Sequence, residues 1–198
     1  LGVATNTGTA ALHVALLALG VGPGDEVITT PLSCIASANP ILFTGARPVF
    51  ADVDPETFNL EAAQVEKKLT RRTRAIVLVH LFGHPVDLDP LLDMAEASRI
   101  PVIEDASQAA GAEYRGRRVG ALARAGTFSL YANKILSSGE GGMVVTNDAE
   151  LATRMASVRN FGQAPGQPFV PPLLGRTYKM SDIHAAVGLA QLAREALA

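Results

Sequence analysis

The sequence predicts an α/β protein in which a mostly parallel sheet carries helices on both faces. Apolar runs of strand length alternate along the chain with longer runs of helical periodicity. One run, from Ala75 to Leu81, is continuously apolar, which indicates a strand buried on both faces. Sheets of this kind bind ligands beyond the carboxyl ends of their strands, so we expect the functional residues to follow strands.

Turn and capping residues divide the first half of the chain. Gly20 is placed to end the first helix, and the Gly-Pro-Gly-Asp turn at 22–25 leads into the next strand. Pro40 should kink the second helix, and Asn59 can cap the third. The expected elements are a helix from Gly8 to Leu19, a strand from Glu26 to Thr29, a helix from Ser33 to Phe43, a strand from Pro48 to Val53, a helix from Asn59 to Leu69 and the strand from Ala75 to Leu81.

The second half continues the alternation and ends in a helix that Ser181 can cap. Prolines at 165, 168, 171 and 172 predict an irregular surface loop from Gly162 to Gly175. The other expected elements are a helix from Asp89 to Ser98, a strand from Pro101 to Glu104, a basic hairpin from Tyr114 to Val119, strands from Gly126 to Tyr131 and from Gly142 to Thr146, and a helix from Ala149 to Arg159.

Composition excludes several classes of protein. The 198 residues are 48% hydrophobic and 18% charged, which is a globular balance for one domain. A formal net charge of −2 argues against a nucleic-acid binder that relies on a basic field. No apolar window is long enough for a membrane span. Cys34 is the single cysteine, so no internal disulfide can form and we expect a reducing, cytoplasmic compartment.

The first candidate site is Thr7-Gly8-Thr9, at the start of the first predicted helix. Free backbone N–H groups and the helix dipole favour an anion there, and two hydroxyls can assist. Gly8 would let the anion approach the backbone closely. The alternative is an ordinary threonine N-cap.

A second candidate site follows the strand that ends near Glu104. Asp105 could hold a protonated ring nitrogen, which makes the ring a better electron sink, as in the chemistry of pyridoxal 5′-phosphate (PLP). Gln108, three residues on, is close enough to donate a hydrogen bond to the same ligand. The alternative is that Asp105 caps the next helix.

Lys134 follows the apolar strand that begins at Gly126, and it is the only lysine between Lys68 and Lys179. A lysine at a strand exit into a cleft can lose its proton and form a Schiff base, and Ser129 nearby could bind phosphate. The glycine-rich segment at 139–142 suggests close approach to a ligand. The alternative is a solvated surface lysine.

These motifs, taken in order, resemble the DegT/DnrJ/EryC1/StrS sugar aminotransferases, which have PLP fold type I. The resemblance covers nearly the whole chain. It is carried by TGTAALHVALLALGVGPGDEVITTP, GARPVFADVDPETFNL, VHLFGHPVDLD, VIEDASQAAGAEYRGRRVG, GTFSLYANK, GEGGMVVTND and YKMSDIHAAVGLAQL. It implies an aminotransferase that uses PLP, an amino donor such as L-glutamate or glutamine, and a nucleotide-linked keto-sugar as acceptor. It also implies a homodimer with active sites at the subunit interface.

The resemblance assigns a role to each candidate residue. Lys134 would form the Schiff base with PLP and then move protons between the substrate carbon and the C4′ carbon. Asp105 would pair with the pyridine nitrogen, and Gln108 would hydrogen-bond the ring hydroxyl. Gly8, Thr9 and Ser129 would hold the phosphate, next to Thr7.

Three positions depart from the family pattern. Cys34 stands where many members have an aromatic residue stacked on the PLP ring, and a thiol gives less contact area there. A buried core cysteine is the alternative. Thr177 stands where an Asn usually reaches the neighbouring subunit's phosphate, and it keeps a hydroxyl donor on a shorter side chain. Ile135 replaces the His or Asn that commonly follows the lysine.

The family usually has a short N-terminal segment and a C-terminal domain that helps to form the substrate site. We therefore expect residues 1–198 to be the PLP-binding large domain of a longer protein. Two alternatives stay open: an inactive PLP-binding or dimerisation module, and an aminotransferase for a carbocyclic ketone such as an inosose. Lys134 favours transamination, because the related sugar dehydratases have His at that position. The four histidines show no metal spacing, so we expect no metal site.

Overall fold

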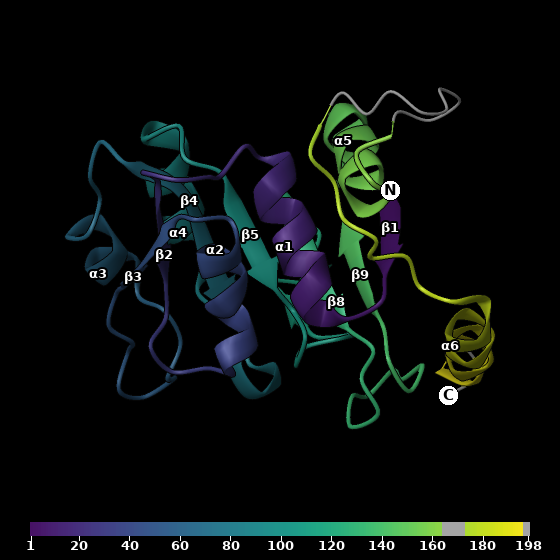
Figure 1. The fold of residues 1–198 in the computed structure, drawn as a ribbon. Coiled ribbons are helices and arrows are strands. Elements are labelled where there is room, and N and C mark those ends of the chain that lie inside the picture. Colours follow the sequence, from purple (N-terminus) through teal and green to yellow (C-terminus); the bar gives the residue numbers. More distant parts are fainter. Residues whose placement is uncertain (164–172, 196–198) are drawn as a thin grey trace.

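The computed structural model describes residues 1–163 and 173–195, and its centre is a seven-stranded sheet (Figure 1). The strand order is β1-β9-β8-β5-β4-β2-β3. Neighbouring strands from β3 through β8 are parallel, and β9 runs antiparallel to both β8 and β1. The strands are β1 (Gly2–Thr5), β2 (Glu26–Thr29), β3 (Arg47–Phe50), β4 (Thr73–Val79), β5 (Val102–Asp105), β8 (Ala125–Ser129) and β9 (Gly142–Val145).

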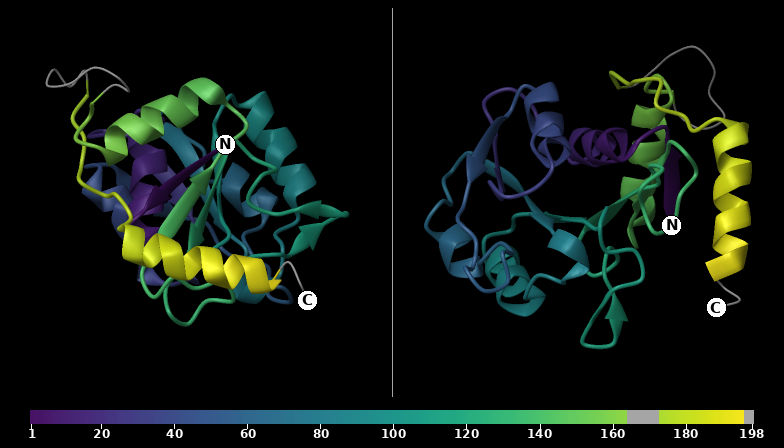
Figure 2. Two further views of the ribbon diagram at one scale, coloured as in Figure 1. Left: turned by 90° about the vertical axis from the view of Figure 1, so that its right-hand side faces the viewer. Right: turned by 90° about the horizontal axis from the view of Figure 1, so that it is seen from below.

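Helices cover both faces of the sheet, as the sequence predicts (Figures 1 and 2). Side chains of successive strand residues point to opposite faces, so Val27 packs with α1 and α5, while its neighbour Ile28 packs with α3 and α4. The helices are α1 (Gly8–Ala18), α2 (Asn39–Phe43), α3 (Ala62–Glu66), α4 (Leu88–Ala97), α5 (Ala149–Arg159) and α6 (Asp182–Glu195). The α/β class with a mostly parallel sheet is therefore confirmed.

Most predicted elements are present, with ends shifted by one or two residues. Thr7 caps α1 by accepting a hydrogen bond from the N–H of Ala10 (3.0 Å), and the hydroxyl of Ser181 accepts from the N–H of His184 (3.4 Å) at α6. The basic hairpin is present as β6 (Glu113–Tyr114) and β7 (Arg117–Arg118). Of the predicted irregular loop from Gly162 to Gly175, residues 164–172 lie outside the described part of the chain.

Two predicted helices are wrong in detail. The segment from Ser33 to Phe43 is broken into a 3₁₀ turn (Ile35–Ser37) and α2, because Pro40 fits the first turn of a helix better than its interior. Asn59 caps no helix, since α3 begins three residues later. Its side-chain amide instead donates to the carbonyl of His84 (3.0 Å) and accepts from the N–H of Leu81 (3.1 Å).

Strand β1 was not predicted, because four residues of mixed polarity give no periodicity. Its existence depends on pairing with β9, which lies about 140 residues away in the chain. The register pairs Thr5 with Gly142, and Gly142 also pairs with Ser129 of β8. This pairing sets the end of β1, and hence the start of α1, beside the end of β8.

A fully buried carboxylate ties the end of β5 to its surroundings. Glu104 accepts hydrogen bonds from His80 Nε2 (3.1 Å) and from the N–H groups of Gly120, Leu122 and Ala123 (2.7 Å each). His80 is also fully buried, and its Nδ1 accepts from the N–H of Val86 (3.1 Å), which assigns the imidazole proton to Nε2.

The same contacts explain the ionisation of Glu104. Burial alone would raise its pKa, but the hydrogen bonds from His80 and from the Gly120 and Ala123 backbone hold the pKa below its ordinary value.

Replacing Glu104 by Ala should lower the free energy of unfolding by about 3–5 kcal/mol, because it leaves His80 and three backbone donors without a buried acceptor. Urea denaturation of the purified protein measures the change. Glu66→Ala is the matched control, since Glu66 is exposed on α3, and it should change stability by less than about 0.5 kcal/mol. Equal losses in the two variants would contradict the role of the buried carboxylate.

Glu26 should make stability depend on acid pH. Hydrogen bonds from Arg47 (2.5 Å), Thr70 (2.7 Å) and Arg72 (2.8 Å) lower its pKa to about 2. Because the folded-state pKa is depressed, its contribution is present above its unfolded pKa of about 4.3 and is lost as pH falls toward 2. We therefore expect Glu26→Gln to flatten the fall in unfolding free energy between about pH 5 and 2. Urea denaturation at several pH values measures this dependence. If the unfolding free energy of the variant fell with pH as steeply as that of the wild type, the assignment would be contradicted.

Candidate active site

A cleft of about 340 Å³ lies where the parallel strands end, and it collects eight of the nine predicted site residues. The ends of β1, β4, β5 and β8 meet at this edge of the sheet, and β9 begins there. The segments that follow β1, β5 and β8 line the cleft, and β4 contributes its last residue, Val79. The predicted residues in the lining are Thr7, Gly8, Thr9, Cys34, Asp105, Gln108, Ser129 and Lys134.

The N-terminus of α1 forms one wall of the cleft. In the described part of the chain, no acceptor is recorded for the N–H groups of Gly8 and Thr9, and α1 has 11 residues to contribute a dipole. A Cβ added at Gly8 would lie 2.8 Å from the Cβ of Ser129, so only glycine allows this approach. Backbone donors and the Ser129 hydroxyl therefore face one small space, which suits an anion such as phosphate.

Asp105 is the last residue of β5 and is only 6% exposed. Its Oδ2 accepts a hydrogen bond from the hydroxyl of Ser37 (2.7 Å), and its Oδ1 accepts from the N–H of Ser107 (3.1 Å). An ionised carboxylate has about four acceptor positions, so it retains capacity for a further donor in the cleft. No helix follows directly, so the alternative of a helix cap at Asp105 is wrong.

The amide of Gln108 is oriented by the turn that follows β4. Its Oε1 accepts a hydrogen bond from the N–H of Phe82 (2.9 Å). Phe82 has φ +54°, a left-handed conformation that costs energy for a side chain of this size. Because Oε1 is engaged, the N–H groups of Gln108 are the part of the amide that remains to donate to a ligand.

Lys134 lies in the segment after β8 and is half-buried, with its side chain lining the cleft. Its backbone N–H donates to the carbonyl of Tyr131 (2.9 Å), which closes a turn at the strand exit. Lys134 also lines an adjoining cavity of about 560 Å³, whose walls include Phe82 and Ile135. An amine at the junction of two spaces can react with groups held in either one.

The departures from the family pattern lie in different places. Cys34 is exposed and lines both cavities, so the alternative of a buried core cysteine is wrong. Ile135 is 63% exposed in the wall of the adjoining cavity. Thr177 is exposed outside the cleft, in an isolated bridge with Asn160. The structure therefore does not bring Thr177 together with the other eight residues of the same chain.

Several lining residues were missed in the sequence. Ser33 and Ser37 follow β2, and the rule that ligands bind after strands could have selected them. Glu140 precedes β9, in the glycine-rich segment already noted. Serines without a recognisable spacing give too little signal to be selected one by one.

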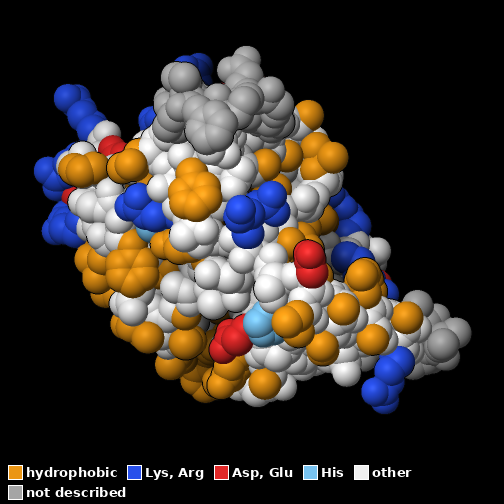
Figure 3. All heavy atoms as spheres, turned by 45° about the vertical axis from the view of Figure 1, so that its right-hand side comes forward, with side chains coloured by type: hydrophobic (Ala, Val, Ile, Leu, Met, Phe, Trp, Pro, Cys, Tyr) orange, Lys and Arg blue, Asp and Glu red, His pale blue; other side chains and the backbone are white. Residues whose placement is uncertain are grey.

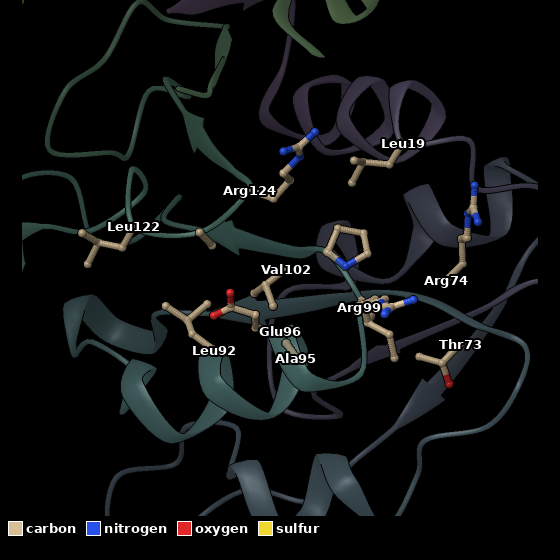
Figure 4. Close-up of a pocket in the computed structure, with 13 residues that line it drawn as sticks. Leu19, Thr73, Arg74, Leu92, Ala95, Glu96, Arg99, Val102, Leu122 and Arg124 are labelled. Atoms are coloured by element: carbon tan, nitrogen blue, oxygen red, sulfur yellow. The ribbon is translucent and has the colours of Figure 1, made fainter. Parts of the chain in front are cut away.

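A larger cavity, of about 830 Å³, lies at the opposite edge of the sheet, where β4, β5 and β8 begin (Figure 4). Its charged side chains Arg74, Glu96, Arg99 and Arg124 are exposed, and Arg124 pairs with Asp148. None of the nine predicted site residues lines it. Size alone therefore does not identify the reactive site, and the smaller cleft carries the chemically distinctive groups.

Two of the histidines, His13 and His80, are buried in the fold. His13 is 2% exposed, and its Nδ1 lies 3.1 Å from the hydroxyl of Tyr178. Burial, and then the charge of Arg176, lower its pKa to about 4, so it is neutral at pH 7. Within residues 1–163 and 173–195, no group of three or more His, Cys, Asp or Glu side chains is arranged to hold a metal ion. None of the helices in these residues is long and apolar enough to cross a membrane.

Comparisons with known proteins agree with this geometry. The chain matches the DegT/DnrJ/EryC1/StrS aminotransferase family over residues 1–196. It is similar to GDP-perosamine synthase of Caulobacter vibrioides, with 51% identity over 192 residues that cover 97% of this chain and 52% of that protein. It is also 46% identical to L-glutamine:2-deoxy-scyllo-inosose aminotransferase of Streptomyces paromomycinus over 196 residues, which cover 94% of this chain and 46% of that protein.

A solved structure gives the same result. The structure of S. venezuelae DesV in complex with a ketimine intermediate matches with a TM-score of 0.93 and 43% identity, covering 98% of this chain and 52% of that chain. The chain spans about half the length of the relatives it matches. On the family match and these likenesses, the chain belongs to the DegT/DnrJ/EryC1/StrS aminotransferase family.

Proposed function

We propose that this chain forms the PLP-binding part of an aminotransferase that moves an amino group from glutamate or glutamine to a nucleotide-linked keto-sugar. The observation that carries the proposal is the meeting of three chemically different groups in one cleft. These are the anion cradle at the start of α1, the carboxylate of Asp105 and the amine of Lys134.

The residues present fit PLP. The N–H groups of Gly8 and Thr9, with the hydroxyl of Ser129, would hold the phosphate. Asp105 would hold the proton on the ring nitrogen, and the N–H groups of Gln108 would donate to the ring hydroxyl. Cys34 lines the same cleft and would contact the ring with less area than an aromatic residue.

Bound PLP supplies an electron sink for the negative charge that develops on the substrate carbon. Lys134 Nζ would hold the cofactor at its aldehyde carbon and would also take and return the proton of the substrate carbon. Asp105 would keep the ring nitrogen protonated. Over the two half-reactions, glutamate and the keto-sugar become 2-oxoglutarate and the amino-sugar, so atoms and electrons balance without a further oxidant.

The acceptor class is part of the proposal. The name of the Caulobacter relative supports a nucleotide-linked sugar, and that of the Streptomyces relative supports the second candidate, a carbocyclic inosose. The adjoining cavity of about 560 Å³ opens beside Lys134 and would receive the acceptor. Glutamine as the donor is supported by the same inosose relative.

A homodimer with shared active sites also belongs to the proposal. Helix α6 lies beyond one end of the sheet (Figure 2), and apolar side chains are exposed along it (Figure 3). Ile183 is 78% exposed, and Leu189 is 67% exposed. Apolar surfaces of this kind favour contact with further protein, and the exposed Thr177 nearby would then be available to a partner subunit's cleft. A reducing cytoplasm suits the single cysteine.

Lys134→Ala should abolish the visible absorbance band that forms when a lysine amine condenses with the aldehyde of PLP. The wild-type protein mixed with PLP should show the band, and borohydride should fix the cofactor on a peptide containing Lys134. Lys68→Ala is the matched control, because Lys68 is exposed just after α3 and does not line the cleft, so the band should be unchanged. A folded wild-type sample without the band would remove the basis of the proposal.

Glutamate should convert the wild-type absorbance band to that of the pyridoxamine form, because the amino group then resides on the cofactor. Rapid-mixing spectroscopy measures this half-reaction without any knowledge of the acceptor. A band that forms with PLP but never responds to glutamate or glutamine would favour the alternative of an inactive binding or dimerisation module. Addition of a nucleotide-linked keto-sugar or of an inosose to the converted form would then identify the acceptor class.

A further inference from the structure

The carboxylate of Asp105 accepts a hydrogen bond from a serine that neither the family pattern nor the proposed function assigns. Ser37 is 3% exposed, and its hydroxyl donates to Asp105 Oδ2 at 2.7 Å, the short distance typical of a charge-assisted hydrogen bond. The two residues are 68 positions apart, so the contact is made by the fold and not by local sequence.

A second serine hydroxyl lies within hydrogen-bond distance of the Ser37 hydroxyl. Ser33 Oγ lies 3.0 Å from Ser37 Oγ. Ser37 has a single hydroxyl proton, and an ionised Asp105 can only accept, so that proton is directed at the carboxylate. Ser33 must therefore be the donor to Ser37, which gives one direction to the chain of hydrogen bonds, from Ser33 through Ser37 to Asp105. Donors arranged in this order polarise and strengthen one another.

The geometry of the segment after β2 makes this arrangement possible. Ser37 ends the 3₁₀ turn Ile35–Ser37, and Ser33 lies four residues earlier, so the two hydroxyls are neighbours, and both residues line the cleft. The N–H of Ser107 holds the other oxygen of Asp105 at 3.1 Å. With one donor on each oxygen, the plane of the carboxylate cannot rotate freely, and its remaining lone pairs keep one direction.

We propose that Ser37, assisted by Ser33, is a positioning residue that orients the Asp105 carboxylate toward the ring nitrogen of the cofactor. This inference rests on the proposed function and adds a role for two residues that bind no atom of the cofactor themselves. It predicts an effect that reaches the cofactor only through the ring nitrogen.

The test is the affinity for PLP of Ser37→Ala, measured by absorbance titration. Loss of one hydrogen bond to a charged group should weaken binding about tenfold. Ser37→Thr keeps the hydroxyl and should restore most of the affinity. Ser157→Ala is the matched control, because Ser157 is also a buried serine, 4% exposed, but lies in α5 with no partner recorded for its hydroxyl among the described residues. It should bind PLP as the wild type does.

A second ligand separates positioning from a merely structural role. In the 1-deaza analogue of PLP a C–H group replaces the ring nitrogen, so Asp105 has no proton to hold. Ser37→Ala should bind this analogue as tightly as the wild type does. An equal loss for PLP and for the analogue, or no loss for either, would overturn the inference.

Two other outcomes are possible: the Ser37→Ala variant could fail to fold, or the wild-type protein could fail to bind PLP. If Ser37→Ala does not fold, as judged by circular dichroism, Ser33→Ala is used with the same pair of ligands. Because Ser33 acts one hydrogen bond further from the carboxylate, its replacement should weaken the binding of PLP about threefold and leave the binding of the analogue unchanged. Unchanged affinity for PLP in this variant would overturn the inference. A wild-type protein that binds no PLP would instead refute the proposed function, whatever the serine variants do.

Discussion

The buried carboxylate of Glu104 holds together the edge of the sheet on which the site depends. It joins the end of β5 to the end of β4 through His80 and to the segment at 120–123 through three backbone donors. Glu104 and Asp105 are consecutive in one strand, so their side chains point to opposite faces. One carboxylate therefore stabilises the fold, while its neighbour is presented rigidly to the cleft.

The reversed strand β9 is the second feature that builds the site. Because β9 pairs with both β1 and β8, it sets the start of α1 against the end of β8. The approach is so close that a Cβ at Gly142 would lie 2.3 Å from the carbonyl oxygen of Thr7. If β9 ran parallel to β8, it would begin at the opposite edge of the sheet, and its first residue would not lie beside the ends of β1 and β8. The anion cradle is thus a product of strand direction as much as of the Thr-Gly-Thr motif.

The elements that the sequence predicts accurately are those whose conformation follows from neighbouring residues in the chain. The helix at 149–159 and the strand at 26–29 were predicted with their observed ends, because periodicity and capping residues are local. Gly8 and Asp105 were selected because they stand at a helix start and a strand end, and Ser129 because it lies close to Lys134 in the sequence. Local patterns do not predict β1, the contacts of Asn59 or the turn before α2, because a distant partner or a proline position overrides local preference there.

The sequence by itself determined the α/β class, the order of its elements, and the types of group available to the site: an anion cradle, an acid and a lysine. These follow from local patterns and from motifs in one order. Only the tertiary structure decided that eight of the nine residues share a cleft, that Thr177 stands apart, and that Ser37 supports Asp105. Such contacts join residues far apart in the chain, and their distances depend on strand order and direction, which no local pattern encodes.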